Sequence, residues 1–393
     1  MSIKKWFKNL FGKKDKRYII IPIFIPHRGC PEDCVFCNQV KIAGAMPNVS
    51  VDDARKIIDE HLETIKKEKD TFIEIAFFGG SFTAVDEEFQ NMMLELANEY
   101  IKAGKVDGIR ISTRPDKINK EIIKRLKKYN VSTIELGIQS SNDYILKQSR
   151  RGHDFDSVIK ASKIIRKNKI NFGAQMMVGL PESNYIDEIN SAKDIVKLKP
   201  NMVRIYPCLV IKNTDLEKMY IDEKYKPLTL DEAVEIVKQV SKIFMEKEIP
   251  IIRIGLQETD EITNPENESS SIVAGPYHPN FRELVDSKLW YEKIVDQISK
   301  INAKIKEAKI YIHPKNASKV LGYKKENIKK LKENYSIDVV LEYNMTMKLD
   351  EFVIKPTEVY EFDDLNIIGE QWNIKKNKNK KKKQKSKMKT KRK

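Results

Sequence analysis

The sequence predicts an α/β fold built as a partial (β/α)6 barrel, followed by a smaller α+β extension at the C-terminal end. Short apolar segments alternate six times with longer segments of helical periodicity, as in a series of βα units. The apolar segments are nearly continuous, which is typical of parallel strands buried on both faces. Six units are too few to close an eight-unit barrel, so we expect an open one.

The elements of the barrel follow from this alternation. We expect strands at residues 18–25, 72–78, 108–112, 133–137, 171–178 and 202–206. The helical segments between them are residues 51–67, 87–103, 119–129, 155–168 and 186–198. After Pro207 the pattern loosens, and we expect a helix at about 229–246 and a short strand at 251–254.

The C-terminal third is predicted to form a separate, smaller unit. Residues 281–300 have helical periodicity, and residues 309–343 follow the order strand, helix, helix, strand. We therefore divide the chain into a basic amphipathic segment (1–17), the barrel (18–255), a helical and loop extension (256–303), an α+β subdomain (304–345), a further extension (346–374) and a disordered lysine-rich tail (375–393).

Basic residues gather at both ends of the chain. Residues 375–393 contain thirteen Lys or Arg and no acid, and residues 1–17 contain seven basic residues and one Asp. The formal net charge of +16 therefore falls mostly on the two ends. Cationic ends favour a polyanionic partner, and we expect RNA. For the tail, a solvated segment that binds nothing is the equal alternative.

The use of cysteine indicates a reducing, cytoplasmic compartment. Four cysteines in 393 residues are too few for a disulfide framework, and three of them lie within eight residues. The fourth, Cys208, is expected to be a buried apolar residue. No apolar run is long enough to span a bilayer, so we expect no transmembrane segment.

The three clustered cysteines, Cys30, Cys34 and Cys37, follow directly after the first expected strand. In parallel barrels the chemistry lies in the loops at the C-terminal ends of the strands, where this cluster belongs. Three thiolates are one ligand short of a closed zinc site, but they can hold three corners of a four-iron cluster. The alternative is a zinc site that is completed by His27.

Polar and glycine residues follow the other expected strands at the same end of the sheet. The second strand leads into Gly79, Gly80 and Ser81, and paired glycines let the backbone approach a ligand closely. The other polar residues near strand ends are Ser112, Arg114, Glu135, Gln139, Arg151, Gln175, Tyr206 and Lys212. Such a ring suits a ligand with several polar groups around an apolar slot, although each residue alone is compatible with an ordinary barrel mouth.

Seven strings resemble, in this order, the radical domain of the Elongator catalytic-subunit family: IPHRGCPEDCVFCNQ, FFGGSF, STRPDKI, ELGIQS, RRGH, MVGLPES and RIYPCLVIKNT. This family belongs to the radical S-adenosylmethionine (SAM) enzymes, and the likeness is strongest to its short bacterial relatives. It covers residues 18–254, with a further stretch at 272–284. The resemblance implies a partial TIM-like barrel of the radical SAM type. It also implies a 4Fe-4S cluster on the three clustered cysteines, with SAM as the cofactor.

The resemblance also implies roles for individual residues. The loop of Gly79, Gly80 and Ser81 matches the one that contacts the methionine amino group of SAM. In the related oxygen-independent coproporphyrinogen oxidases, three matching positions hold the cofactor. These correspond here to Gln139 and Arg151, for ribose and carboxylate, and to Gln175, for ribose. We assign the remaining residues as cofactor-binding (Ser112, Glu135) or as facing the substrate (Arg114, Tyr206, Lys212).

The implied chemistry is reductive cleavage of SAM to methionine and a 5'-deoxyadenosyl radical, which removes hydrogen from an unactivated carbon. The implied partners are RNA, most of all tRNA, and a reductant such as flavodoxin or ferredoxin. Residues after 254 show no match to the acetyltransferase domain of the Elongator family, so we do not expect its acetyl-CoA chemistry. The alternatives are a small-molecule substrate, or a non-catalytic protein that binds zinc or RNA.

Residues 309–343 resemble a minimal KH core, which clamps the nucleic-acid backbone at a Gly-x-x-Gly loop between two helices. The corresponding loop here is Gly322-Tyr323-Lys324-Lys325, with a lysine in place of the second glycine. We expect this segment either to contact RNA or to be a plain capping subdomain with an exposed basic face.

Overall fold

The computed structural model describes residues 17–25, 34–38, 49–256, 258–259, 262–349 and 351–360. The chain divides into two compact units, Met1–Val285 and Asp286–Lys393. Several sequence predictions lie outside the described residues, namely the basic amphipathic segment 1–17 except its last residue, the ligands His27 and Cys30, and the lysine-rich tail.

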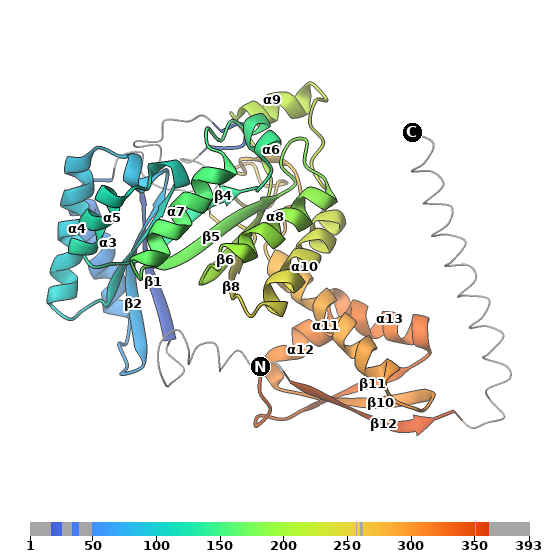
Figure 1. The fold of residues 1–393 in the computed structure, drawn as a ribbon. Coiled ribbons are helices and arrows are strands. Elements are labelled where there is room, and N and C mark those ends of the chain that lie inside the picture. The colour runs from blue at the N-terminus through green and yellow to red at the C-terminus, as the bar shows by residue number, and fades with distance from the viewer. Residues whose placement is uncertain are drawn as a thin grey trace. The chain divides into compact units, whose positions relative to one another are not determined.

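The first unit is built on a seven-stranded parallel sheet in which the strands follow the order of the chain (Figure 1). Its strands are β1 (Arg17–Ile25), β2 (Thr71–Gly79), β3 (Gly108–Thr113), β4 (Val131–Gln139), β5 (Asn171–Val178), β6 (Met202–Pro207) and β8 (Ile251–Ile254). Every neighbouring pair is parallel. This confirms the open parallel barrel, to which the short strand at 251–254 adds a seventh member.

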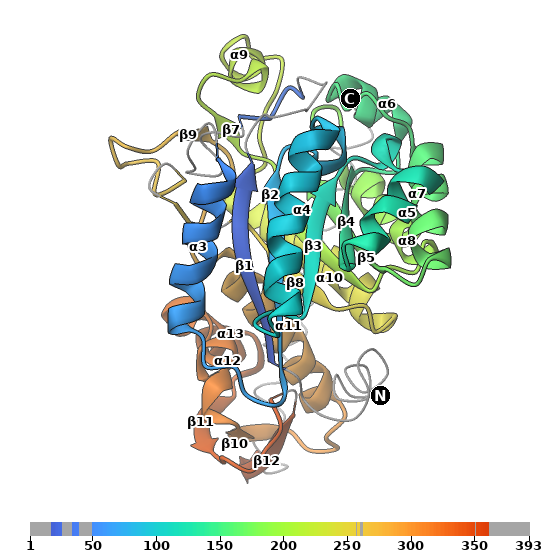
Figure 2. The same cartoon turned by 90° about the vertical axis from the view of Figure 1, so that its left-hand side faces the viewer.

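Helices cover one face of this sheet (Figure 2). They are α3 (Val51–Thr64), α4 (Glu87–Lys102), α5 (Lys120–Lys128), α7 (Phe155–Lys167), α8 (Tyr185–Lys197) and α10 (Leu230–Glu246). Side-chain caps fix where several of them begin. Ser50 and Asp53 form a capping box at α3, as do Thr229 and Glu232 at α10.

The sequence did not predict the shorter elements of this unit. These are η1 (Phe82–Ala84), η2 (Pro115–Lys117), α6 (Asp143–Gln148), α9 (Asp215–Ile221) and the antiparallel pair β7 (Val210–Ile211) and β9 (Ile272–Ala274). None of them exceeds two helical turns or three strand residues, so none shows a clear hydrophobic period. Three of them, η1, η2 and α6, lie at the C-terminal ends of sheet strands.

The second unit consists of helices packed on a three-stranded sheet. Its elements are α11 (Phe281–Ser299, which begins before the unit boundary), β10 (Ile305–Ile312), η3 (Pro314–Asn316), α12 (Ala317–Leu321), η4 (Tyr323–Lys325), α13 (Glu326–Tyr335), β11 (Asp338–Tyr343) and β12 (Phe352–Val359). The central strand β10 is parallel to β11 and antiparallel to β12. Trp290, Ile310 and Leu331 belong to its apolar core. The expected order of strand, helix, helix, strand is present, whereas β12 was not predicted.

No helix among the described residues is both long enough and apolar enough to cross a bilayer.

Candidate functional site

The two described cysteines of the cluster lie in the segment 34–38, in the connection between β1 and α3. Cys34 is buried, and the N–H of Cys37 donates to the carbonyl of Cys34 at 2.9 Å. Between them, Val35 donates its N–H to Ser149 O at 3.3 Å and accepts from the N–H of Leu216 at 2.7 Å. The segment is therefore fixed between the end of α6 and the start of α9.

Arg151 joins this cysteine segment to the end of β4. Its Nη1 lies 3.3 Å from Cys34 Sγ, and its Nη2 donates to the carbonyl of Gly137 at 2.8 Å. The side chain is almost fully buried. The positive charge of this guanidinium lies where it can balance the negative charge of a cysteine sulfur that binds iron. The sequence named Arg151 as a cofactor residue, and the structure places it against one of the predicted ligands.

Gln139 and Gln175 meet beside Arg151. Gln175 Nε2 lies 3.4 Å from Gln139 Oε1, and the ladder between β4 and β5 shifts register between Gly137 and Gln139. A β-carbon at Gly137 would lie 3.1 Å from Gln139 Nε2 and 3.2 Å from Arg151 Nη2. Gly137 therefore leaves the space in which these side chains gather. The three residues predicted as ribose and carboxylate contacts are neighbours, and Gly137 is a supporting residue that the sequence did not indicate.

The glycine loop after β2 lies against the end of β1. Gly79 has a φ of +114°, and a β-carbon there would lie 2.5 Å from Ile25 O. The N–H of Gly80 donates to the same carbonyl at 3.2 Å. Ser81 is buried, and its Oγ lies 2.8 Å from Thr113 Oγ1 and accepts from the N–H of Arg114 at 3.2 Å. The loop is thus fixed to β1 through its backbone and to the end of β3 through Ser81.

Deeper in the barrel, away from the C-terminal edge of the sheet, the interior contains a network of ion pairs. Arg204 binds Glu135 through Nε at 2.6 Å and Nη2 at 3.1 Å, and Arg110 binds the same carboxylate. Arg110 also binds Glu74, whose other oxygen accepts from the hydroxyls of Ser132 and Thr133 at 2.7 Å each. Burial opposes ionisation of Glu135, but the two guanidiniums hold its pKa below the usual range.

Both oxygens of Glu135, which we expected to bind the cofactor, are thus engaged by arginines of the network. Ser112 lies two residues beyond Arg110 on the same strand, on the same face, and it is half-buried. Ser112 is also the register partner of Glu135 in the ladder between β3 and β4, so these two predicted residues lie side by side at one level of the sheet. The alternation of side chains along a strand predicts that Arg110 and Ser112 share a face, but the sequence does not show which carboxylates are already bound by an arginine.

Two residues assigned to the substrate side lie close to the cysteine segment. Tyr206 packs on the apolar cluster that contains Cys34 and Met177, and its hydroxyl lies 3.4 Å from Arg204 Nη1. The carbonyl of Lys212 accepts from Asn38 Nδ2 at 3.1 Å, while its ammonium donates to Ser270 O at 2.7 Å.

The third, Arg114, is buried at the start of η2, where its Nε donates to Asp116 Oδ1 at 2.9 Å. Its backbone binds Ser81, so Arg114 lies beside the glycine loop. All three substrate-side predictions therefore fall at the C-terminal edge of the sheet.

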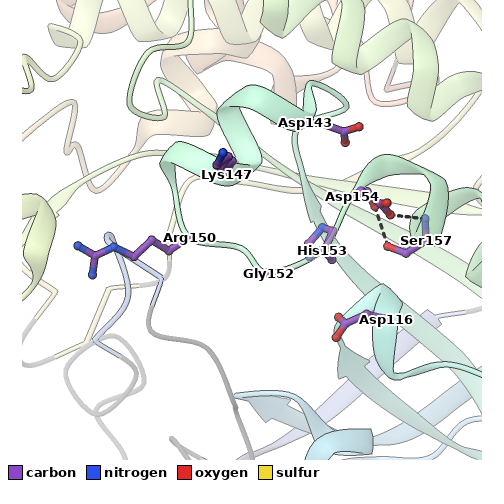
Figure 3. A pocket seen from close by; sticks show the side chains of 8 residues that line it. All are labelled: Asp116, Asp143, Lys147, Arg150, Gly152, His153, Asp154 and Ser157. Atoms are coloured by element: carbon purple, nitrogen blue, oxygen red, sulfur yellow. Dashed lines mark hydrogen bonds between the residues drawn. The ribbon is translucent and has the colours of Figure 1, made fainter.

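A cavity of about 560 Å³ opens beside α6 and the start of α7, and Figure 3 shows the side chains around it. It is lined by Asp116, Asp143, Lys147, Arg150, Gly152, His153, Asp154 and Ser157. Burial, together with the charges of Arg151 and Arg114, lowers the pKa of His153 to about 4, so the imidazole is neutral at pH 7. The sequence did not single out His153, although the string RRGH contains it.

The fourth cysteine differs from the cluster cysteines in its surroundings. Cys208 is 1% exposed, and burial raises the pKa of its thiol to about 12. A thiol that stays protonated is a poor metal ligand, and this confirms the expectation that Cys208 is a buried apolar residue.

The donor chemistry of the site fits an iron–sulfur cluster. Cys34 and Cys37 supply two thiols in one short segment, and the guanidinium of Arg151 lies beside the first. Within the described part of the chain, no three His, Cys, Asp or Glu side chains gather as a metal site. Cys30 and His27, which separate the iron prediction from the zinc alternative, fall outside that part.

Comparisons with known proteins show which families and proteins this chain resembles. The family described as "Radical SAM superfamily" matches residues 24–195, and the "Radical_SAM C-terminal domain" matches residues 200–291. A tRNA uridine(34) acetyltransferase of Methanocaldococcus jannaschii is 31% identical over 191 residues, which is 44% of this chain and 35% of that protein. An uncharacterized protein of the same archaeon is 30% identical over 244 residues, which is 60% of this chain and 72% of that one.

A solved structure of Elp3 from Methanocaldococcus infernus, lacking its N-terminal residues 1–46, has 26% sequence identity and a TM-score of 0.55. The alignment covers 72% of this chain and 64% of that one. This chain spans about a third of the length of the tRNA uridine(34) acetyltransferases it matches. From the barrel, the cysteine segment and these matches, we conclude that the chain belongs to the radical SAM superfamily and that its barrel region is similar to Elongator-related proteins.

Proposed function

We propose that this chain is a radical SAM enzyme that acts on RNA, with tRNA as the leading substrate. The observation that carries the proposal is the gathering of Gln139, Arg151 and Gln175 beside Cys34 at the C-terminal edge of the sheet. The choice of RNA rests on relatives that are named tRNA uridine(34) acetyltransferases.

The residues of the site divide into two groups. Cys30, Cys34 and Cys37 would hold a 4Fe-4S cluster, whose reduced form supplies the electron that cleaves bound SAM and yields the 5'-deoxyadenosyl radical. The guanidinium of Arg151 would balance the negative charge of the Cys34 sulfur and could also bind the carboxylate of SAM. Both anionic groups are stabilised by N–H donors that carry positive charge.

The second group surrounds the place where the cofactor and the substrate meet. The amides of Gln139 and Gln175 offer donors and acceptors to a ribose diol, and the backbone around Gly79 and Gly80 offers close approach. Apolar residues around Cys34, among them Phe36 and Met177, exclude water from one side of the site.

The enzyme needs a one-electron donor from outside, and a flavodoxin or ferredoxin has the right chemistry. Thiols that carry a cluster persist in a reducing compartment, so we place the protein in the cytoplasm.

The test is anaerobic reconstitution with iron and sulfide, followed by assay of 5'-deoxyadenosine with and without total tRNA. We expect a brown protein with about four iron per chain and 5'-deoxyadenosine whose formation rises when tRNA is added. Formation that responds to a metabolite extract and not to tRNA would reject the RNA substrate and retain the radical chemistry. A colourless protein that holds one zinc would reject both.

Two cysteine variants sharpen this test. We expect Cys34→Ala to lose most of its iron, because it removes a ligand beside Arg151. Cys208→Ala should keep the wild-type iron content, since this buried thiol is not a ligand. Equal iron in the two variants would contradict the assignment of the ligands.

A further inference from the structure

We propose that Glu188 of α8 is a positioning residue of the site, which together with Tyr225 fixes residues 179–183 against the cysteine segment. We call residues 179–183 the β5 turn, because they follow β5 directly. The role of this turn at the cluster rests on the proposed function. The contacts that fix the turn lie among described residues of the first unit.

Gly179, the first residue of the turn, is bound on both sides of its backbone. Its N–H donates to Glu188 Oε1 at 2.8 Å, and its carbonyl accepts from the hydroxyl of Tyr225 at 2.7 Å. Glu188 is 3% exposed and lies on the first turn of α8, where Asn184 and Asp187 form a capping box. Two separate parts of the chain, α8 and the segment after α9, thus fix the same residue.

The backbone of the β5 turn has conformations that need such fixing. Gly179 has a φ of +82° and Glu182 a φ of +64°, and residues with a side chain rarely adopt positive values. A β-carbon at Gly179 would also lie 2.9 Å from Leu228 Cδ1. A backbone of this kind persists only where the surrounding structure determines it, so the turn is expected to relax when its contacts are lost.

The hydrogen bonds of Ser183 indicate the protonation state of Glu188. Ser183 Oγ lies 2.8 Å from the carbonyl oxygen of Leu180 and 2.8 Å from Glu188 Oε1, but a serine hydroxyl has only one proton to donate. A protonated Glu188 satisfies both contacts, because its carboxyl then donates to Ser183 while Ser183 donates to Leu180. In agreement with this, burial raises the pKa of Glu188 to about 7.

The β5 turn closes the apolar side of the site. Leu180 is 2% exposed and belongs to the same apolar cluster as Cys34, Phe36 and Met177. Tyr225 belongs to this cluster as well. An outward movement of the turn would therefore remove Leu180 from the cluster and admit water beside the cysteine segment. Iron bound there would then be more accessible to a chelator in solution.

The proton on Glu188 makes the position of the turn depend on pH. In the closed turn the carboxyl keeps its proton up to about pH 7, whereas in an open turn it is hydrated and has the ordinary pKa of 4.5. Opening therefore becomes easier as pH rises from 4.5 to 7, and it changes little above that range.

The ionisable groups around Glu188 do not offset this effect. Asp187 of α8, Cys208 after β6 and Tyr225 after α9 all interact with its charge, and each of them can become only neutral or negative. On α10, which packs against α8, the ammonium of Lys238 pairs with an acid of its own helix. None of these groups stabilises a carboxylate at Glu188.

The experiment measures two quantities in full-length protein at pH 6 and pH 8. One is hydrogen–deuterium exchange at residues 179–183, with and without iron, and the other is the rate at which a chelator removes iron after anaerobic reconstitution. The variants are Glu188→Gln, Glu188→Ala and Tyr225→Phe. The matched control is Tyr100→Phe, which removes a hydroxyl that donates to Asp59 Oδ1 at 2.8 Å between α3 and α4. Exchange in β3 reports on global unfolding in every variant.

We expect the ratio of wild-type to Glu188→Gln exchange at the β5 turn to rise about tenfold between pH 6 and pH 8, because only the glutamate ionises. At pH 6, Glu188→Ala should raise exchange roughly five- to hundredfold and Tyr225→Phe about two- to tenfold, since each loses hydrogen bonds to the turn. The rates of iron loss should follow the same order and the same pH dependence. Exchange in β3 should stay unchanged, as should both quantities in Tyr100→Phe.

Two results would overturn the inference. Exchange at the β5 turn that is equal in Glu188→Ala and the wild type would mean that Glu188 does not fix the turn. Faster exchange without faster iron loss would mean that the turn does not protect the cluster. In both cases 5'-deoxyadenosine formation by the wild type would leave the proposed function intact. A protein that takes up no iron would overturn the proposed function, while exchange in the iron-free protein would still decide whether Glu188 fixes the turn.

Discussion

Replacement of Gly79 by alanine tests whether the glycine loop controls the cysteine segment. At a φ of +114° an alanine is strained, at a cost of about 1–2 kcal/mol. Its β-carbon would also lie 2.5 Å from Ile25 O and 2.8 Å from Ile25 C, so the ends of β1 and β2 must separate. Such overpacking typically costs about 1–3 kcal/mol. We therefore expect Gly79→Ala to lower the free energy of unfolding by about 2–5 kcal/mol.

The matched control is Gly104→Ala. Gly104 has a φ of +69°, but no atom lies within 4 Å of the β-carbon position, so only the conformational cost of about 1–2 kcal/mol remains. Urea denaturation of both variants measures the difference. Because β1 leads into the cysteine segment, Gly79→Ala should also take up less iron on anaerobic reconstitution. Equal stabilities, together with full iron content in Gly79→Ala, would refute the close approach as a constraint on the site.

Three further predictions address single charged groups. Arg151→Lys keeps the positive charge but cannot reach both Cys34 Sγ and Gly137 O, so SAM binding by calorimetry should weaken about tenfold or more, whereas the exposed Arg150→Lys should change little. Glu135→Gln leaves the buried Arg204 without its carboxylate partner and Arg110 with Glu74 alone, and it should lower the free energy of unfolding in urea by about 3–5 kcal/mol. The matched change Glu99→Gln, in a surface pair, should cost less than about 1 kcal/mol, and similar losses would contradict the buried network. Burial raises the pKa of Glu188 from 4.5 to about 7, so the folded state keeps a proton that the unfolded state has lost, and stability falls as pH rises through this window. At pH 8, the free energy of unfolding of Glu188→Gln in urea should therefore exceed that of the wild type by roughly 1–3 kcal/mol, and this difference should be smaller at pH 5. A difference that does not change with pH would contradict the prediction.

The strands of the barrel could be predicted from the sequence because burial on both faces leaves an almost continuous apolar signal. The strands at 171–178 and 251–254 have the same limits in the structure, and each of the others differs by no more than two residues at an end. The short elements between strands and helices carry no such signal. Strand β12 was not predicted because Pro356 and several charged residues interrupt it, and such a strand is tolerated only at a sheet edge.

The candidate site could be predicted as a set of residues but not as a geometry. The order of motifs along the chain correctly brought Gln139, Arg151 and Gln175 to one edge, since parallel strands end on the same side. It did not show that Glu135 is engaged by two arginines, because that depends on which residues of four strands share a level. It also gave no sign that Gly137 leaves the space these side chains occupy.

The ion-pair network of Glu74, Arg110, Glu135 and Arg204 has a consequence for how such a barrel can diversify. A chamber lined by apolar layers can be deepened one residue at a time, because each smaller side chain leaves only a cavity. Here, shortening any one of the four residues leaves an opposite charge unpaired in the barrel interior, so the interior can be enlarged only if several positions change together. We therefore expect this fold to accommodate new substrates through changes in the loops at the C-terminal edge of the sheet, which vary freely, while the ion-pair network is retained.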